Sequence, residues 1–343
     1  LEDFKKLVSK AHGMGMYVII DWVANHNSPD HSWTSSNPEF YSKDSLGKFI
    51  PPVVDWSDVV DLDYSNKELR KQMANAMKFW VTETGIDGFR CDVADMVPLD
   101  FWEETIPELQ KIKPLFFLAE AENPELHKKA FNTGYNWTLH HILNDIAKGN
   151  KTVSALDDYF FTKKEKEFPW GAFKMNFTSN HDENSWNGTE FERMGDAAKA
   201  MAVICATSPG TLLIYSGQEA AMDCRLEFFE KDEIPWNNYA LHEFYQALLH
   251  LKTRNQALWN GKHAGLMKRF KTEEANVFSF VREKDDAKVV VLVNLSSSPV
   301  KVNLDDKLID GNFINVFTEK KISLPLVSKT DMAPWGFIVL EKI

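Results

Sequence analysis

Four short segments of the 343-residue sequence place acidic, amide and basic side chains directly after apolar runs. Parallel strands in α/β proteins carry their functional residues at their carboxyl ends, so polar clusters that follow such runs are expected to share a site. The alternative is that the clusters only cap helices or solvate loops. It does not explain why each cluster follows a run of apolar residues typical of a buried strand. The segments are DWVANH at 21–26, GFRCDVADM at 88–96, LFFLAEAE at 115–122 and FTSNHDEN at 177–184.

Arg90 and Asp92 are two residues apart in a predicted strand, and alternation sends both side chains to the same face. A guanidinium beside a carboxylate stabilises the charged form and lowers the pKa of the acid. This is the state that a carboxylate nucleophile requires. Taken alone, the pair fits a structural ion pair better, and only the other three clusters favour a chemical role.

Glu120 ends the apolar run LFFLA, where partial desolvation is expected to raise the pKa of its carboxyl group and suit it to general acid catalysis. Glu122 has the same strand parity, and the spacing does not separate the two. Asp182 adds a third carboxylate that is able to stabilise positive charge on a substrate. An acid held neutral beside a carboxylate held ionised is what cleavage of a glycosidic bond requires.

The first cluster contributes Asp21, Asn25 and His26, which are suited to binding polar groups or a metal ion. Asn25 with a loop aspartate is a candidate calcium site, although the sequence has no EF-hand spacing. His26 and His181 differ from the remaining histidines only by their position after predicted strands. By contrast, His140 is assigned to hydrogen bonding within the core.

Composition excludes several classes of protein. The chain has 39 Lys and Arg against 50 Asp and Glu, a formal charge of −11, which disfavours nucleic acid and anionic membrane surfaces as partners. No apolar stretch approaches the ~20 residues that span a bilayer. The three cysteines lack CxxC spacing, so neither a disulfide framework nor a zinc cluster is indicated. No organic cofactor is expected.

Helical patterns alternate with short apolar runs about six times, which predicts an α/β fold with a mostly parallel sheet. A helix is expected from an N-cap at Ser65 to a stop at Gly85. Two further helical stretches are expected at about 123–131 and 138–167. From about Gly261, short β-rich runs predict an antiparallel sandwich.

The expected organisation is therefore a catalytic domain over 1–260 and a C-terminal β-sandwich domain over 261–343. Residues from about 27 to 63 are rich in Pro, Ser, Asp and aromatic residues without sustained periodicity. This segment is expected to form a loop-rich lobe inserted in the catalytic domain.

In this order, the four segments resemble the signature regions of the α-amylase family, glycoside hydrolase family 13. VVDLDYS at 59–65 resembles the additional region of the inserted lobe, and PGTLLIYSGQE at 209–219 resembles the eighth strand and its loop. The resemblance covers the whole chain. It implies a (β/α)8 TIM barrel of the α-amylase type followed by a C-terminal antiparallel β-sandwich.

The resemblance also implies roles for individual residues. Asp92 matches the nucleophile, Glu120 the general acid and base, and Asp182 the transition-state stabiliser. Glu120 is selected over Glu122 because the family's acid follows a small residue, here Ala119.

Five further positions match residues around the family's site. Arg90, His26 and His181 are expected to bind around the cleaved sugar, and Asp21 to support the site. Asn25 matches a position that often ligates calcium, so calcium is the one cofactor expected.

Two departures from the family pattern affect these expectations. Many members carry Lys-His three and four residues after the nucleophile, where this chain has Asp95 and Met96, which places the acceptor-side sugar contacts in doubt. Family chains also begin with two further βα units before the region that matches Leu1. The chain is therefore expected to be N-terminally truncated, with an incomplete barrel of about six strands. Open strand edges would then leave it with little activity of its own.

The implied activity is that of a retaining α-glucan hydrolase, which cleaves α-1,4 bonds of starch-like polymers or maltooligosaccharides through a covalent glycosyl-enzyme. Retention predicts that the carboxyl groups of Asp92 and Glu120 lie ~5 to 5.5 Å apart. The alternatives are an α-glucosidase or transglycosylase acting on short α-glucosides, and a non-catalytic relative of the same fold. An α-glucan is the expected partner, the substrate class slightly favours a secreted or periplasmic location, and the oligomeric state is left open.

Overall fold

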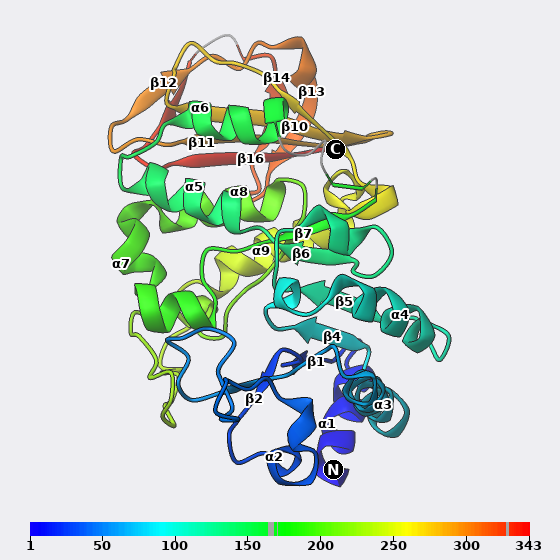
Figure 1. Ribbon diagram of the computed structural model, residues 1–343. Helices are drawn as coiled ribbons and strands as arrows, with labels where there is room; N and C mark the ends of the chain where they lie inside the picture. The colour runs from blue at the N-terminus through cyan, green and yellow to red at the C-terminus, as the bar shows by residue number, and fades with distance from the viewer. Residues whose placement is uncertain (164–167, 170, 327–328) are drawn as a thin grey trace. The chain divides into compact units, whose positions relative to one another are not determined.

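The computed structural model describes residues 1–163, 168–169, 171–326 and 329–343 (Figure 1). The chain forms two compact units, residues 1–135 and 136–343, and each has its own hydrophobic clusters. The β-rich segment from 261 onward belongs to the second unit. The domain boundary expected at 260/261 lies inside that unit and stays a prediction.

The first unit is built on parallel strands. Their register places Asp21 opposite Arg90 and Cys91 opposite Ala119, so the ends of neighbouring strands are level with one another. The hydrogen-bonded order is β1 (Ile19–Trp22), β4 (Gly88–Cys91), β5 (Phe116–Ala119) and β6 (Thr133–Tyr135). The long helices of this unit are α1 (Glu2–Gly13), α3 (Lys67–Thr84) and α4 (Leu99–Gln110).

Helix α3 begins one residue later than predicted. The side chain of Asn66, not Ser65, accepts hydrogen bonds from the backbone N–H groups of Glu68 and Leu69. Ser65 lies in the preceding turn, where its own N–H donates to the Asp63 carboxylate. The predicted stop is correct: Gly85 has φ +73°, a left-handed conformation that favours glycine and ends the helix.

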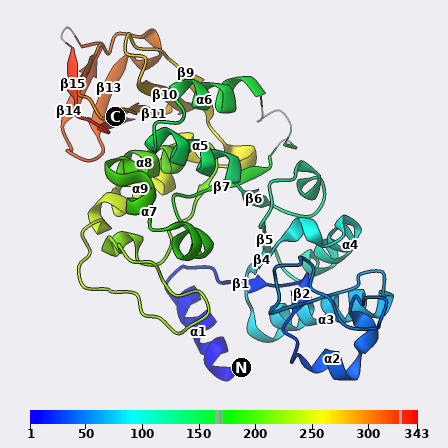
Figure 2. The same cartoon turned by 60° about the vertical axis from the view of Figure 1, so that its left-hand side comes forward.

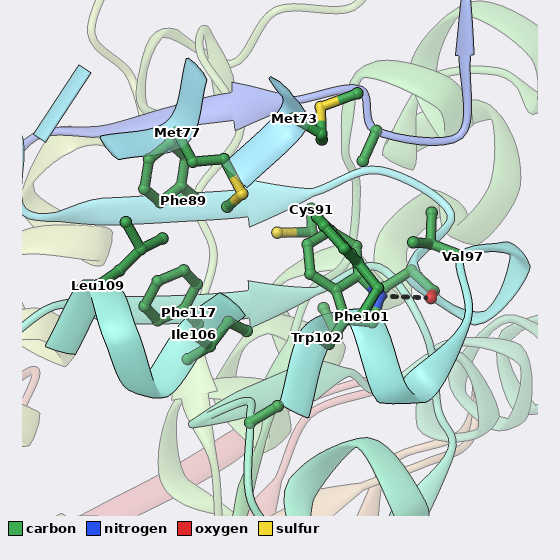
Figure 3. Close-up of a cluster of buried hydrophobic side chains, with 14 of the residues drawn as sticks. Met73, Met77, Phe89, Cys91, Val97, Phe101, Trp102, Ile106, Leu109 and Phe117 are labelled. Atoms are coloured by element: carbon green, nitrogen blue, oxygen red, sulfur yellow. Dashed lines mark hydrogen bonds between the residues drawn. The ribbon is translucent and has the colours of Figure 1, made fainter. Parts of the chain in front are cut away.

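Aromatic and aliphatic side chains fill the space between the strands and their helices (Figure 3). Phe89 and Cys91 of β4 are fully buried on this side, with Phe117 of β5 stacked on Phe89. Because strand residues alternate, Arg90 projects from the opposite face. The surrounding helices contribute Met73, Met77, Phe101, Trp102, Ile106 and Leu109.

The segment expected to be loop-rich contains little regular structure. A short antiparallel pair joins β2 (His26–Asn27) to β3 (Val60–Asp61). Between them lie α2 (Ser32–Ser36) and a 3-10 turn, η1 (Pro38–Phe40). The Tyr41 hydroxyl donates a 2.8 Å hydrogen bond to the Asn27 side chain and ties this segment to β2.

The second unit pairs two parallel strands, β7 (Phe173–Asn176) and β8 (Thr211–Leu212), and carries five α-helices among its described residues. Figure 2 shows helices α5, α7, α8 and α9 gathered in this unit. The helices are α5 (Trp137–Ala147), α6 (Val153–Asp157), α7 (Glu190–Met194), α8 (Ala198–Thr207) and α9 (His242–Arg254).

Two helical predictions differ from the structure in detail. The stretch at 123–131 contains only the 3-10 turn Pro124–His127, after which the Lys128 N–H donates to the Glu125 carbonyl three residues back. The stretch at 138–167 is divided into α5, α6 and the π-helical turn Asp158–Lys163, and residues 164–167 lie outside the described residues. The other short turns are Ala94–Met96, Glu183–Asn187, Gly195–Ala197, Gln218–Ala220, Gln256–Leu258, Gly261–His263 and Lys307–Ile309.

The predicted antiparallel β-sandwich is confirmed. A six-stranded sheet in the order β14-β13-β16-β11-β10-β9 faces the two-stranded sheet β12-β15. Val290 and Leu292 of the large sheet, Val302 of β12 and Met332 of β15 share one buried cluster. The strands are β9 (Leu266–Arg269), β10 (Val277–Lys284), β11 (Ala287–Asn294), β12 (Val300–Val302), β13 (Gly311–Asn315), β14 (Lys321–Leu324), β15 (Thr330–Met332) and β16 (Phe337–Lys342).

Among the described residues, no helix is both long enough and apolar enough to cross a bilayer.

Candidate functional site

Arg90 is the centre of the candidate site in the first unit. Its Nη1 lies 2.6 Å from Asp92 Oδ1 and 2.9 Å from Asp21 Oδ1, and its Nη2 lies 2.8 Å from Glu120 Oε2. One guanidinium therefore contacts three carboxylates that come from three different strand ends. The predicted placement of Arg90 and Asp92 on the same face is confirmed.

Hydrogen bonds between the strands bring these side chains together. The parallel ladder continues past the end of β4, where the Asp92 N–H donates to the Trp22 carbonyl at 3.1 Å. In the same way, the Glu120 N–H donates to the Cys91 carbonyl at 2.9 Å. Each acidic residue is thus fixed by its backbone beside the neighbouring strand, and the carboxylates do not depend on mobile loops for their position.

Tyr135 completes the surroundings of Arg90. Arg90 Nε donates a 3.2 Å hydrogen bond to the Tyr135 hydroxyl, and the guanidinium carbon lies 5.7 Å from the centre of the ring. Burial opposes the charged form of Arg90, but Tyr135, Glu120 and Asp21 together carry its pKa above the ordinary value. Burial also raises the pKa of Tyr135 to about 12. Arg90 is therefore a permanent cation in this site and Tyr135 a neutral phenol.

Glu120 lies in more polar surroundings than the sequence suggested. Besides the contact with Arg90, its Oε2 accepts a 2.9 Å hydrogen bond from the backbone N–H of Val93. Phe117 and Ala119 of the apolar run pack in the core with the helices, and alternation sends Glu120 to the opposite face, which carries Arg90. Arg90 contacts Glu120, the residue that the family motif selects over Glu122.

Val93, which follows Asp92, has a backbone conformation that β-branched residues rarely adopt. Its φ is +36° and its ψ is +50°, in the left-handed region. Such a conformation costs roughly 1 to 3 kcal/mol and persists where surrounding contacts enforce it. The turn aims the N–H of Val93 at Glu120. No local pattern predicts this conformation, because valine favours extended structure.

His26 lies in β2 opposite Asp61, with its ring 5.5 Å from that of Trp56. Burial lowers its pKa, while the charges of Asp92, Asp58 and Asp61 act in the opposite direction. The net shift keeps the imidazole neutral at neutral pH. His26 is thus within electrostatic reach of Asp92 and is suited to hydrogen bonding with a neutral ligand.

Asn25, the residue expected to bind calcium, is 3% exposed, and its side-chain amide lies 3.4 Å from Nδ1 of His26. Within residues 1–163, 168–169, 171–326 and 329–343, no group of three or more His, Cys, Asp or Glu side chains is arranged to hold a metal ion. Calcium at Asn25 stays a prediction.

Asp182 and His181 belong to the second unit and follow β7, as the alternation of the sequence predicted. His181 Nε2 lies 3.4 Å from Asp182 Oδ2, and both side chains reach solvent. Asp182 begins the π-helical turn Glu183–Asn187. The structure therefore brings Asp21, Arg90, Asp92, Glu120 and His26 together in the first unit, and His181 and Asp182 together in the second.

A buried network holds the turn that Asp182 begins. His140 Nε2 lies 3.1 Å from Glu183 Oε2, and the His140 ring stacks on Phe177 at 4.7 Å. Burial lowers the pKa of His140, although Glu183 acts in the opposite direction. Arg193 Nη1 donates a 2.9 Å hydrogen bond to the Asn144 side chain beside this pair. The network links helix α5 to the turn, and tertiary pairing of this kind is not visible in a local sequence pattern.

The model of the alpha-amylase catalytic domain matches residues 1–47 and 53–277 of the chain. The alpha-amylase 3 of Dictyoglomus thermophilum is 25% identical over 99% of this chain and 79% of its own length. A maltosyltransferase of Picrophilus torridus, named for α-1,4-glucan and maltose 1-phosphate, is 28% identical over 92% of this chain, which spans about half of that protein (51%).

Solved structures show the same fold. The crystal structure of a maltogenic alpha-amylase from Thermotoga neapolitana superposes with a TM-score of 0.87 at 28% identity, over 100% of this chain and 81% of that one.

Proposed function

Because the chain belongs to the alpha-amylase catalytic-domain family and is an enzyme of that type, we propose that it is a retaining hydrolase of α-1,4-glucans. The coarser activity, hydrolysis or transfer at α-glucosidic bonds, is common to its named relatives. The proposal adds the stereochemistry, the bond and the residues. Its substrates are starch-like polymers or maltooligosaccharides.

One observation carries the proposal: the two η nitrogens of Arg90 hold Asp92 and Glu120 at 2.6 and 2.8 Å. Contact with one guanidinium brings the two carboxylates to the same part of the site, which is compatible with the short spacing of retaining enzymes. A larger separation would leave room for a water molecule between carboxylate and sugar, as inversion requires. The shared guanidinium therefore favours attack by a carboxylate.

The proposed reaction has two steps. Asp92 attacks the anomeric carbon while Glu120 gives a proton to the leaving glycosidic oxygen, which forms a glycosyl ester and frees the shorter glucan. Glu120, now a carboxylate, then takes a proton from water. The activated water attacks the anomeric carbon and releases Asp92 with net retention of configuration. Arg90 contacts the Asp92 carboxylate before the first step and balances the charge of the Glu120 carboxylate after it.

The other residues act by binding and by charge in this proposal. His26 is neutral and is suited to hydrogen bonds with sugar hydroxyls, and Asp21 positions the Arg90 guanidinium through its 2.9 Å contact. Asp182 is assigned to stabilising the oxocarbenium-like transition state, and His181 to binding the same sugar. The assignments of Asp182 and His181 depend on the sequence motif.

Transfer to a sugar acceptor is the second candidate, because the glycosyl ester is shared by both reactions. Two observations favour keeping it: a relative is named as a maltosyltransferase, and the positions after the nucleophile are Asp95 and Met96 in place of Lys-His. Asp95 is exposed and accepts a 2.9 Å hydrogen bond from Asn123. A different surface on the acceptor side changes whether water or a sugar hydroxyl attacks the glycosyl ester.

Covalent trapping tests the proposal without depending on fast turnover. A 5-fluoro α-glycosyl fluoride forms a slowly hydrolysed ester on a retaining nucleophile. Mass spectrometry of the intact chain should show one added glycosyl group, and peptide mapping should place it on Asp92. The Asp92→Asn variant should remain unlabelled, while Asp95→Asn, a nearby acid outside the Arg90 cluster, should label as the wild type does. Labelling of another residue, or none, would overturn the proposal.

Products distinguish the two candidates. Chromatography after incubation with maltoheptaose should show shorter maltooligosaccharides. Products longer than the substrate would assign transfer, and glucose alone would assign exo-acting α-glucosidase activity.

A further inference from the structure

Three aromatic side chains of the second unit are exposed together. Trp186, Phe228 and Phe229 are 56%, 44% and 68% exposed. Their ring centres lie 4.9 Å apart for Trp186 and Phe228, 5.0 Å for the two phenylalanines and 6.0 Å for Trp186 and Phe229. Leaving three large rings in water forfeits burial worth about 25 cal/mol per Å² of apolar surface, so such a cluster calls for a ligand. We call these three residues the aromatic triad.

Side-chain hydrogen bonds hold together the two segments that carry the triad. Trp186 lies in the π-helical turn Glu183–Asn187, and the two phenylalanines lie in the segment after β8. Asn184 joins the two: its Nδ2 donates to the Cys224 carbonyl at 3.1 Å, and its Oδ1 accepts from the Leu226 N–H at 2.8 Å. Asn184 is 2% exposed, so this clamp is shielded from water. The rings are therefore presented before any ligand arrives.

The clamp is supported from the protein side and from the solvent side. Glu183, next to Asn184, contacts buried His140. On the solvent side, Arg225 Nε lies 2.9 Å from Glu192 Oε2, and this ion pair anchors the segment that carries Phe228 and Phe229. A surface ordered in advance binds with a smaller loss of conformational entropy.

We propose that the aromatic triad is a binding platform for an α-glucan chain, additional to the carboxylate site. The apolar C–H face of a glucose ring packs on an aromatic face while its hydroxyls remain in water, which suits side chains that are half exposed. Trp186 belongs to the turn that Asp182 begins, four residues along, so the platform adjoins a segment assigned to sugar binding. This inference rests on the proposed function, from which it takes the class of ligand.

The surroundings of the triad favour a sugar over a protein partner. The segment around the phenylalanines is exposed and highly charged, with Glu227, Glu230, Lys231 and Asp232 close by in the chain. A stable protein interface needs about 1,000 Å² of buried surface with a largely uncharged centre. Three rings among charged residues match the footprint of a few sugar units. A second copy of the chain is the competing occupant.

The test measures binding of maltoheptaose by calorimetry in an Asp92→Asn background, so that the probe is not consumed. Replacing Trp186 by alanine should weaken binding about two- to tenfold, and Trp186→Phe should recover most of the loss. Phe79→Ala is the matched control: Phe79 is 46% exposed and lies 5.9 Å from another ring, but in the first unit. Its affinity should equal that of the background.

The outcomes separate the platform from the catalytic proposal. If Trp186→Ala binds maltoheptaose as tightly as the background, or if it changes the oligomeric state instead of the affinity, the platform is overturned while trapping at Asp92 still stands. If the background binds no maltoheptaose, the platform is also overturned. If binding depends on Trp186 but Asp92 is never labelled, the platform stands and the proposed mechanism fails. A circular dichroism spectrum identical to that of the wild type establishes that each variant is folded.

Discussion

The backbone N–H of Val93 donates a 2.9 Å hydrogen bond to Oε2 of Glu120, and Val93 holds φ at +36° to make it. The residue that follows the proposed nucleophile therefore orients the proposed acid. The same residue, Val93, carries the backbone strain and orients the acid.

Replacing Val93 by glycine should release this strain. Glycine adopts positive φ freely, which recovers about 1 to 3 kcal/mol, against about 0.5 to 1 kcal/mol for the greater freedom of the unfolded chain. We expect the free energy of unfolding to stay level or rise by about 1 kcal/mol, while labelling of Asp92 by the glycosyl fluoride becomes slower. Urea unfolding and labelling rates measure the two effects. Val97→Gly, at a buried position with φ −94°, should lose at least about 2 kcal/mol, and a similar loss in both variants would contradict the strain argument.

The Arg90 cluster should be worth far more than a comparable cluster on the surface. Arg90→Ala leaves the largely buried carboxylates of Asp92 and Glu120 facing one another beside the more exposed Asp21, and we expect a loss of about 3 to 5 kcal/mol in the free energy of unfolding. The control is Arg70→Ala, because Arg70 also contacts two carboxylates, Asp100 and Glu104, which are 63% and 72% exposed. That variant should lose about 1 kcal/mol or less. Equal losses in urea unfolding would show that the Arg90 contacts are not buried in the way described.

The stability of the second unit should fall as the solution is acidified. Burial lowers the pKa of His140 in the native state, whereas an unfolded histidine titrates near 6.5. Below that pH the unfolded chain binds a proton that the native chain excludes, so native stability decreases as pH falls from about 7 toward 5. Glu183 adds a loss at lower pH. Burial opposes its ionisation, but His140 and Arg193 bring its native pKa below the ordinary value.

The measurement is urea unfolding across this pH range. His140→Gln should show a flatter pH dependence than the wild type, even though it also loses the stacking on Phe177. The control is His263→Gln, since His263 is exposed, and its slope should match the wild type. Parallel slopes for all three proteins would exclude His140 as the source.

Gly88 should tolerate no side chain. A Cβ built there would lie 1.8 Å from the Phe116 carbonyl oxygen, because β4 and β5 approach closely at this point. Gly88→Ala must push the two strands apart, and we expect a loss of about 3 kcal/mol or more. Gly85→Ala meets open space and carries only the penalty of positive φ, about 1 kcal/mol. The order of the two midpoints in thermal unfolding checks the prediction, and a reversed order would contradict it.

Periodicity was sufficient to place the strand ends and to put Arg90 and Asp92 on one face, because both follow from local alternation. It also predicted that α3 ends at Gly85, because glycine readily adopts the left-handed conformation found at that position. It missed the cap at Asn66, since Ser65 and Asn66 are both good caps and only tertiary contacts decide between them.

Three features of the site were beyond the reach of the sequence pattern. No motif singled out Tyr135, because its contact with Arg90 joins residues 45 apart in the sequence. The positive φ of Val93 contradicts the preference of valine and exists because surrounding contacts impose it. The polar surroundings of Glu120 come from Arg90 and the Val93 N–H, which belong to the neighbouring strand and its turn. The apolar run that precedes Glu120 contains no information about these neighbours.

The burial of two of the three thiols leaves one cysteine accessible to a labelling reagent. Of the three cysteines, Cys91 and Cys205 are buried and Cys224 is exposed. Burial shields Cys91 and Cys205 from reagents and raises the pKa of both thiols, whereas Cys224 is accessible even though its pKa is raised as well. A maleimide fluorophore should therefore attach to native protein at Cys224 alone. Because Asn184 clamps the carbonyl of that same residue, the dye would report directly on whether the two segments stay joined when sugar is added.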